Sequence, residues 1–366
     1  MDREQRWAYL DALKALAIFC VCLYHFPIGV SGELTRPMTA GMLTGRFFRG
    51  LCSVCVPLFM MVNGALLLSR PLHLRRHFAR CVQLFISLYV WYLLTMMAAQ
   101  AWRHGAGYVA QNMTGILQSA LFLYEYDGVT MNHLWFMQML LAVYLIAPCL
   151  KAALDSHDAS VLQGMKATGL VLVLLCFATR DFARLQAVLP GLRYLDLSGL
   201  ETMNPFRSVY GAMIVYFMLG GWLHTHREAM LRVRPLACAV LLVGGAALLF
   251  AEWLLTSIRT GTMFDIVYNG YDCVATLMLS AGLFISAAKL EARFTMKEGA
   301  ARVLRLVGRN TLAVYYLHWL LGLTVLSGLS LPACFPMNQL KALALVAVCS
   351  LLGEAMRRVP GLRRLV

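Results

Sequence analysis

Ten apolar runs, each long enough to cross a lipid bilayer, constrain what this chain can fold into. A membrane-spanning helix needs about 20 mainly apolar residues, and in lipid only helices and closed barrels satisfy every backbone N–H and C=O group. Only 14% of the 366 residues are charged, against about 25% in a soluble domain. The sequence therefore predicts an all-α integral membrane protein, a bundle of about ten transmembrane helices near residues 8–28, 47–69, 79–101, 133–150, 163–179, 208–224, 235–256, 268–288, 310–328 and 338–356.

Lysine and arginine are distributed unevenly between the two sets of connecting segments. With the N-terminus placed in the cytoplasm, 20 of the 32 lysines and arginines fall in cytoplasmic connections and 10 in the opposite ones. This bias follows the positive-inside rule and predicts that both termini are cytoplasmic. The net charge of +14 then mostly reflects topology, so we expect no nucleic-acid partner.

The chain shows no low-complexity linker and no clear internal repeat, so we expect a single membrane domain over residues 1–366. Charged residues interrupt the first apolar run and no cleavage site follows it, which favours a retained span over a signal peptide. Residues 116–124 are too few to span and predict a re-entrant or interfacial helix. The pair Cys52 and Cys55 has redox or metal spacing, but within an apolar run it favours packing.

The first predicted helix carries Lys14 and His25 in addition to Asp11. They are 11 residues apart, which is three helical turns plus about 20°, so they share a face but are roughly 16 Å apart along the axis. Lys14 then lies in the inner leaflet and His25 near the outer end. Ionisable residues in a span indicate a functional site. The alternative is that Lys14 only pairs with Asp11 and His25 only ends the helix.

A basic cluster lies between the second and third predicted spans, at residues 69–81. Arginine binds phosphate through two parallel hydrogen bonds, and the start of the following helix adds free N–H groups. Positive-inside anchoring explains such a cluster equally well. The candidate anion ligands are Arg75, Arg76, His77 and Arg80.

Further candidates lie in the fourth and ninth predicted spans. His133 and Trp135 open the fourth span on the outer side, where an interfacial histidine and a membrane-belt tryptophan are the alternative interpretation. His318 lies eight residues into the ninth span, where a histidine needs a partner or a cavity. No histidine has metal-ligand spacing with another ligand, so we predict no metal site.

Five segments, taken in order, resemble the acyltransferase 3 family of multi-pass membrane acyltransferases. "YLDALKALAIFCVCLYH" (9–25) resembles the family's opening helix with its Arg/Lys-x10-His motif, and "SVCVPLFMMVNGALLL" (53–68) resembles its helix 2 signature. "RHFARC" (76–81), "HLWFM" (133–137) and "NTLAVYYLH" (310–318) resemble the motifs of helices 3, 4 and 9. The resemblance covers residues 9 to about 320 and is closest to the bacterial O-acetyltransferases of enterobacterial common antigen.

The resemblance implies transfer of an acyl group, often acetyl, from cytoplasmic acyl-coenzyme A to a hydroxyl of a cell-surface or lipid-linked glycan. It implies a multi-pass protein of the bacterial cytoplasmic membrane, with acyl-CoA as co-substrate and no bound cofactor. His25 would be the general base, the basic cluster would hold the donor phosphates, and Lys14 would line the donor's path. His133 and Trp135 would shape the acceptor site, with His318 and Asn63 in the cavity.

Three positions depart from the family pattern. Lys14 stands where arginine is commoner, which keeps the charge but loses the planar fork. Asn63 replaces a serine. The family's RxxR pair gives His77-x-x-Arg80 here, with Arg76 one position earlier.

A rival hypothesis is a transporter or flippase for a glycan or small anion. Coupled transporters usually carry intramembrane carboxylates, and the candidates are Asp11, Glu252, Asp272 and Glu354. A third option, a membrane scaffold without catalytic activity, leaves Lys14 and His25 on one helix face unexplained.

Overall fold

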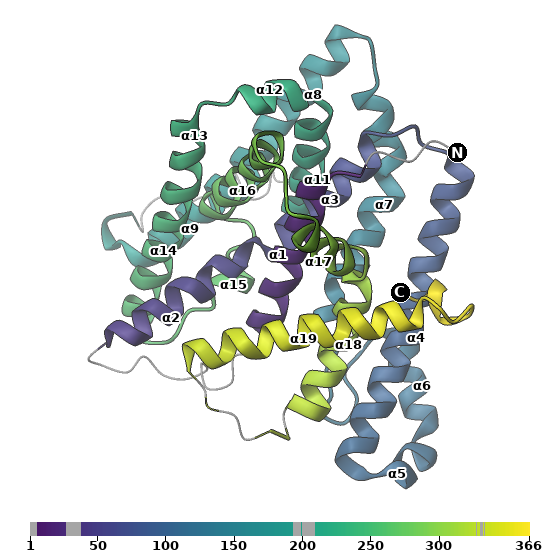
Figure 1. The fold of residues 1–366 in the computed structure, drawn as a ribbon. Coiled ribbons are helices and arrows are strands. Elements are labelled where there is room, and N and C mark those ends of the chain that lie inside the picture. The colour runs from purple at the N-terminus through teal and green to yellow at the C-terminus, as the bar shows by residue number, and fades with distance from the viewer. Residues whose placement is uncertain are drawn as a thin grey trace.

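The computed structural model describes residues 6–26, 38–192, 199, 209–326, 328–329, 332 and 334–366. These residues form helices and turns, with one isolated bridge between Tyr126 and Val129. Figure 1 shows the helices, which follow one another as α1 Ala8–His25, α2 Ala40–Gly50, α3 Cys55–Leu68, α4 Leu74–His104, α5 Ala106–Gln111, α6 Met113–Phe122, α7 Trp135–Leu154, α8 Ala159–Val173, α9 Thr179–Val188, α11 Val209–Thr225, α12 Arg227–Arg232, α13 Pro235–Ala239, α14 Gly245–Thr260, α15 Ile266–Asn269, α16 Val274–Arg293, α17 Glu298–Arg309, α18 Thr311–Leu321 and α19 Phe335–Met356.

Helices lie at all ten predicted spans, although their lengths differ from the prediction. Within the described ranges, eight helical segments are long and apolar enough to cross a membrane. The other two predicted spans are shorter helices. α11 has 17 residues, and α18 reaches Leu326 only through a π-helical turn. The predicted all-α membrane fold is confirmed.

Helices also occupy segments that the apolar pattern assigns to connections, among them α17 and most of α2. α17 is amphipathic. It buries Val307 and Gly308 while its arginines face outward, so its average hydropathy is too low for the apolar pattern to predict it. α2 begins at an N-cap, where the Thr39 hydroxyl accepts a hydrogen bond from the Met42 N–H at 3.2 Å. The short helix predicted at 116–124 is present as α6.

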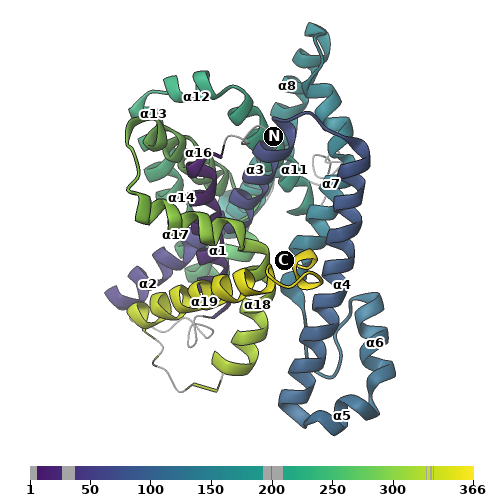
Figure 2. The same cartoon turned by 45° about the vertical axis from the view of Figure 1, so that its right-hand side comes forward.

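The first helix, α1, lies at the centre of the bundle (Figures 1 and 2). It packs against α3, α16, α17, α18 and α19. Leu13, Ala17, Ile18 and Cys22 are buried, so the helix is covered on several sides, as expected for a helix apolar around most of its circumference. Lys14 and His25 therefore face neighbouring helices.

Helices α3 and α11 pack with their backbones in contact. A Cβ atom added at Gly64 would lie 1.8 Å from the Phe217 carbonyl oxygen, and one added at Gly220 would lie 2.0 Å from the Met61 carbonyl oxygen. Small residues allow such close approach in membrane bundles, where packing holds helices together. This contact positions α3, which carries residues of the site described below.

Replacing Gly64 with alanine should destabilise the protein by about 3 kcal/mol, the upper end of the usual cost of overpacking, because the two backbones must separate. Thermal unfolding of the purified protein in detergent measures the effect. Gly164→Ala is the matched control, since a Cβ there meets nothing within 4 Å and alanine favours the helix. A Gly64→Ala protein that melts at or above the wild-type temperature would contradict this packing.

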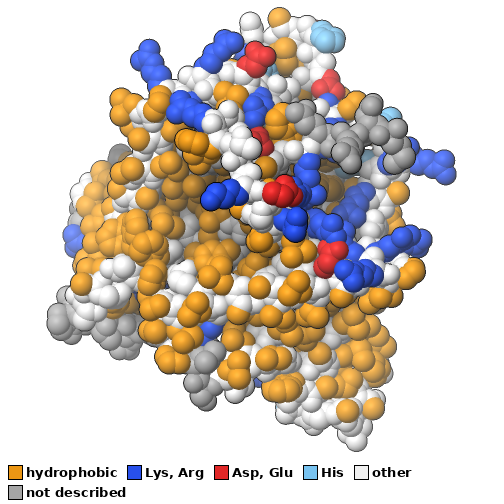
Figure 3. Space-filling model, in the orientation of Figure 1, with side chains coloured by type: hydrophobic (Ala, Val, Ile, Leu, Met, Phe, Trp, Pro, Cys, Tyr) orange, Lys and Arg blue, Asp and Glu red, His pale blue; other side chains and the backbone are white. Residues whose placement is uncertain are grey.

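Charged side chains gather on part of the surface only. Figure 3 shows lysine and arginine along the upper edge and at the centre right of this face, beside α12, α17 and the C-terminal end of α19. α12 carries Arg227, α17 carries Arg305 and Arg309, and Arg357 follows α19 as its C-cap. Hydrophobic side chains cover most of the remainder, as expected for a surface in contact with lipid.

Candidate active site

Two neighbouring cavities lie among α1, α3, α7 and α18. The larger one, which we call the outer cavity, has a volume of about 720 Å³, within the range of 300–1,000 Å³ typical of small-molecule sites. The smaller one, the inner cavity, has about 190 Å³. The outer cavity is lined by Val21, Tyr24, His25, Arg49, Cys55, Val56, Phe59, Asn132, His133, Trp135, Phe136, Tyr210, Asp265, Tyr268, Tyr271, Tyr315 and Trp319.

Three histidines from three separate elements meet beside the outer cavity. His25 ends α1, His133 lies just before α7, and His318 lies in α18. The ring centroids are 5.5 Å apart for His25 and His318, 6.4 Å for His25 and His133, and 5.7 Å for His133 and His318. The sequence separates these residues by more than 100 positions, and the fold brings all three candidates together.

His25 and His133 line the outer cavity, whereas His318 lies behind them. His318 is fully buried, and its Nδ1–H donates a hydrogen bond to the Val314 carbonyl at 3.0 Å. The expected position of His318 in a cavity wall is therefore corrected to the layer beneath that wall. From there it contacts the His25 ring and supports it.

Buried polar atoms without a hydrogen-bond partner gather around these histidines. In the described part of the chain they include His133 Nδ1, His318 Nε2 and Trp319 Nε1. Trp319 stacks on His133 with ring centroids 4.4 Å apart and meets His25 edge-on at 5.1 Å. Each unpartnered buried polar group costs about 1–3 kcal/mol, and such groups are typical of functional sites.

An arginine and an aspartate, which the sequence analysis did not single out, complete the polar lining. The Tyr24 hydroxyl donates to Asp265 Oδ2 at 2.7 Å. The Arg49 guanidinium lies 4.9 Å from the centre of the Tyr24 ring, and its Nη1 donates to the Tyr24 carbonyl at 3.3 Å. In the sequence, the only feature that could have pointed to Arg49 and Asp265 is their contact residue Tyr24, which directly precedes the motif histidine.

Aromatic side chains form much of the remaining wall. Trp135 lies 5.7 Å from Tyr271, 5.9 Å from Tyr210 and 6.5 Å from Tyr268 between ring centroids. Trp135 was predicted for this site, and it is part of this wall. Cys55 also lines the outer cavity, with its thiol 3.6 Å from the Tyr271 hydroxyl. Cys52 and Cys55 are both buried and free.

The inner cavity joins the other end of α1 to the basic start of α4. Lys14, Arg80 and Asn63 line it, together with Gly308 and Thr311 at the junction of α17 and α18. No side chain caps the start of α18 at Asn310, so the first N–H groups of that helix suit an anion. Lys14 and Arg80, predicted separately, therefore line the same cavity.

Lys14 also forms the ion pair that was the alternative interpretation. Its Nζ lies 3.1 Å from Asp11 Oδ1, and Arg6 Nε lies 2.6 Å from the second oxygen, Oδ2. Asp11 is therefore shared by two cations. The two interpretations of Lys14 are compatible, because the same side chain reaches both Asp11 and the cavity.

Asn63 connects α3 to α7 at the wall of the inner cavity. Its Oδ1 accepts a hydrogen bond from the Tyr144 hydroxyl at 2.6 Å, and its Nδ2 donates to the Phe59 carbonyl at 2.8 Å. The second bond is the back-bond to residue i−4 that a serine also makes in helices. The amide thus replaces at least this structural function of the family's serine.

The remaining basic candidates do not line either cavity. His77 is buried, and its Nε2 bonds to the Tyr144 carbonyl at 2.8 Å. It therefore belongs to the contact between α4 and α7, and its predicted role as a donor ligand stays a prediction. Arg75 and Arg76 are exposed. Arg76 precedes Arg80 by one helical turn on the same face.

The family comparison identifies the chain. The family model of the acyltransferase domain, Acyl_transf_3, matches residues 7–353. This chain belongs to the acyltransferase 3 family. It is therefore a multi-pass membrane acyltransferase, and the match does not single out the enzymes of enterobacterial common antigen. Comparisons with curated proteins and with solved structures found no match.

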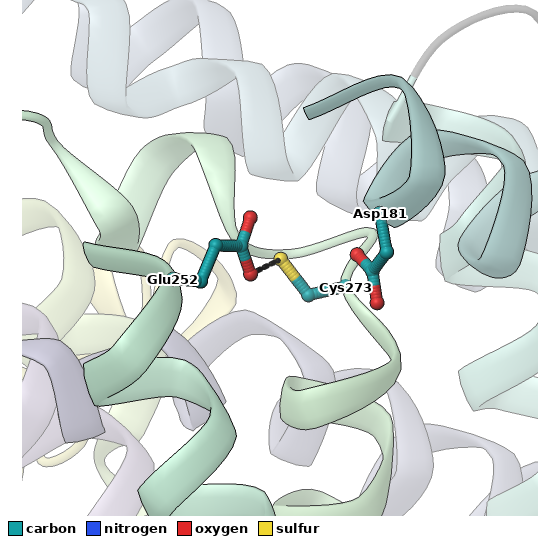
Figure 4. Close-up of side chains that lie close together, drawn as sticks. All are labelled: Asp181, Glu252 and Cys273. Atoms are coloured by element: carbon teal, nitrogen blue, oxygen red, sulfur yellow. Dashed lines mark hydrogen bonds between the residues drawn. The ribbon is translucent and has the colours of Figure 1, made fainter. Parts of the chain in front are cut away.

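A separate polar cluster in the acyltransferase joins α9, α14 and the segment before α16 (Figure 4). Ligand-type atoms of Asp181, Glu252 and Cys273 lie within 4.8 Å of one another, and the thiol donates to Glu252 Oε2 at 3.1 Å. This is the only such grouping in the described ranges. The sequence analysis, which predicted no metal, did not anticipate it.

An arginine lies within this cluster. Arg184 Nη1 is 2.8 Å from Cys273 Sγ and 3.4 Å from both Glu252 Oε1 and Asp181 Oδ1, while its Nη2 is 2.5 Å from Asp272 Oδ1. A guanidinium supplies the positive charge that the carboxylates need. The cluster is therefore an ion network, which we call the Arg184 network.

Proposed function

We propose that the protein transfers an acetyl group from acetyl-CoA on the cytoplasmic side of the cell membrane to a hydroxyl of a surface glycan or lipid-linked saccharide. The observation that carries this proposal is the pair of adjacent cavities. One is lined by Lys14 and Arg80, which suit an anionic donor, and the other by His25 and His133, which suit proton transfer. The Acyl_transf_3 match supports acyl transfer as the chemistry.

The size of the inner cavity suits only part of a coenzyme A molecule. About 190 Å³ is below the range of sites that hold a whole small ligand. The acyl-bearing arm would occupy the cavity, and the charged nucleotide would remain at the surface near Arg80 and the exposed Arg75 and Arg76. Arginine binds phosphate through two parallel hydrogen bonds, and the start of α18 adds free backbone donors.

The outer cavity suits a sugar. Its tryptophan and tyrosine rings offer apolar faces, and Arg49, Asp265 and Asn132 offer hydrogen-bonding groups. Sites of this kind combine apolar walls with a few polar groups that fix orientation. A saccharide hydroxyl placed beside His25 would face the inner cavity from the side opposite to Lys14 and Arg80.

In the proposed reaction, His25 removes the proton from the acceptor hydroxyl as its oxygen attacks the thioester carbonyl carbon. The carbon–sulfur bond then breaks, the new ester remains on the sugar, and the coenzyme leaves as a thiolate that takes up a proton. Histidine suits this step because its pKa ordinarily lies near neutrality. His318 and Trp319 would hold the imidazole in position.

The transporter alternative is less well supported, because the candidate carboxylates are engaged. Asp11 pairs with Arg6 and Lys14, Glu252 and Asp272 pair with Arg184, and Glu354 pairs with Arg309. Ion-coupled transport needs carboxylates that bind and release their ion. Carboxylates already neutralised by arginine or lysine are poorly suited to that task.

Deleting the gene tests the proposed function. We expect a surface or lipid-linked glycan of the deletion strain to lose the mass of one acetyl group at each modified sugar, measured by mass spectrometry. Expression of the wild-type gene should restore the group, and the His25→Ala variant should not. Glycans of identical mass in the two strains would refute the glycan acceptor. Loss of a larger group would keep the acceptor and refute acetyl as the acyl group.

A further inference from the structure

Three aromatic side chains line both cavities at once. Phe59 of α3, Phe136 of α7 and Tyr315 of α18 contribute to the outer and to the inner cavity. Each is buried, with exposed fractions of 7%, 7% and 5%. We call these three residues the aromatic partition. They lie where a group must pass to go from the Lys14 side to the His25 side.

Contacts hold the three rings in place. The Phe136 ring centroid lies 5.7 Å from that of Phe59 and 5.7 Å from that of Tyr315, typical spacings for aromatic pairs. The Tyr315 hydroxyl donates a hydrogen bond to the backbone carbonyl of His133. The partition is therefore held in place by α3, α7 and α18 and by the backbone of His133. In a close-packed interior, a group can pass between these rings only when one of them rotates.

We propose that the aromatic partition selects the length of the transferred acyl chain, passing an acetyl group and holding back longer chains. The inference rests on the proposed function. The donor enters from the inner cavity with its acyl end leading, and the acceptor hydroxyl waits beside His25. The carbonyl carbon must reach that hydroxyl. The hydrocarbon part of the acyl chain, which leads the carbonyl, must therefore pass the partition and share the outer cavity with the acceptor.

Leucine substitutions at Phe59 and at Phe136 test this filter, because leucine stays apolar but removes the ring. Each variant is expressed in the deletion strain, and inside-out membrane vesicles containing the native acceptor receive labelled acetyl-CoA or butyryl-CoA. The quantity measured is the ratio of kcat/KM for butyryl-CoA to that for acetyl-CoA. Phe284→Leu is the matched control, since Phe284 is fully buried and lines neither cavity.

We expect the ratio to rise by at least about tenfold in the Phe59→Leu and Phe136→Leu variants, the smallest effect usual for one methylene in a fitted pocket, and to stay unchanged in Phe284→Leu. Vesicles are compared at equal protein amount by immunoblotting. An unchanged ratio with acetyl transfer intact overturns the filter alone, and so does an equal rise in Phe284→Leu. Absence of acetyl transfer by the wild type overturns the proposed function and the filter together.

Discussion

Replacing His25 with alanine should lower kcat for acyl transfer by about 10²–10⁴-fold, the usual contribution of a general base. His25 lines the outer cavity, apart from Lys14 and Arg80 in the inner cavity, so acyl-CoA should still bind with nearly unchanged affinity. An interaction that acts only in the transition state lowers kcat and kcat/KM equally. Turnover in proteoliposomes and calorimetric titration with acyl-CoA measure the two quantities separately.

Two comparison variants make this result specific. Lys14→Met should mainly raise the KM for acyl-CoA, and Lys14→Arg should be tolerated. Arg6 still pairs with Asp11 in both variants, so no buried carboxylate loses all its partners. His157→Ala changes an exposed histidine and should leave both constants unchanged. If His25→Ala weakens acyl-CoA binding as much as Lys14→Met does, the division between the two cavities is wrong.

Apolar length was sufficient to predict the membrane fold from the sequence. Each apolar run, such as 79–101, predicts a helix by itself, because lipid offers no hydrogen-bond partner to the backbone. α17 escaped because its buried face consists of a few residues set among arginines. The contact of α3 with α11 depends on glycines that face each other across more than 150 residues, and no local pattern records such a pairing.

The candidate site was predictable where one helix carries the signal. The periodicity of α1 places Lys14 and His25 on one face, and both face the wall formed by the aromatic partition. The motif gave the position of His77 but could not show that its ring bonds to a backbone carbonyl of α7. Arg49 and Asp265 were missed because their relation to Tyr24 exists only after folding.

The Arg184 network shows the same limitation, and it carries a stability prediction. The sequence presents Arg184 as one of the basic residues of a connection, whereas the structure surrounds it with three carboxylates. Its Nη2 also donates to the Asn269 carbonyl, so it fixes the segment that carries Tyr268 and Tyr271. The network thus connects protein stability to one wall of the outer cavity.

Replacing Arg184 with methionine should destabilise the protein by about 3–5 kcal/mol, the usual cost of removing one partner from a buried ion pair. The side chains of Arg184, Asp272 and Glu252 are only 20%, 11% and 16% exposed, so water compensates little for the lost charge. Thermal unfolding in detergent measures the loss. Arg184→Lys should fall between wild type and methionine, because lysine keeps the charge but cannot form the fork.

Arg232→Met is the matched control, because its partner Glu228 and Arg232 itself are 92% and 80% exposed and such pairs contribute little. Adding Glu252→Gln to Arg184→Met removes the charge of a carboxylate that has lost its arginine partner and should recover part of the stability, since neighbouring substitutions couple. The surviving Arg184→Met protein should also bind its acceptor more weakly, as the tyrosine wall loses its support. If Arg184→Met unfolds at the same temperature as the wild type or as Arg232→Met, the network contributes nothing to holding α9, α14 and α16 together.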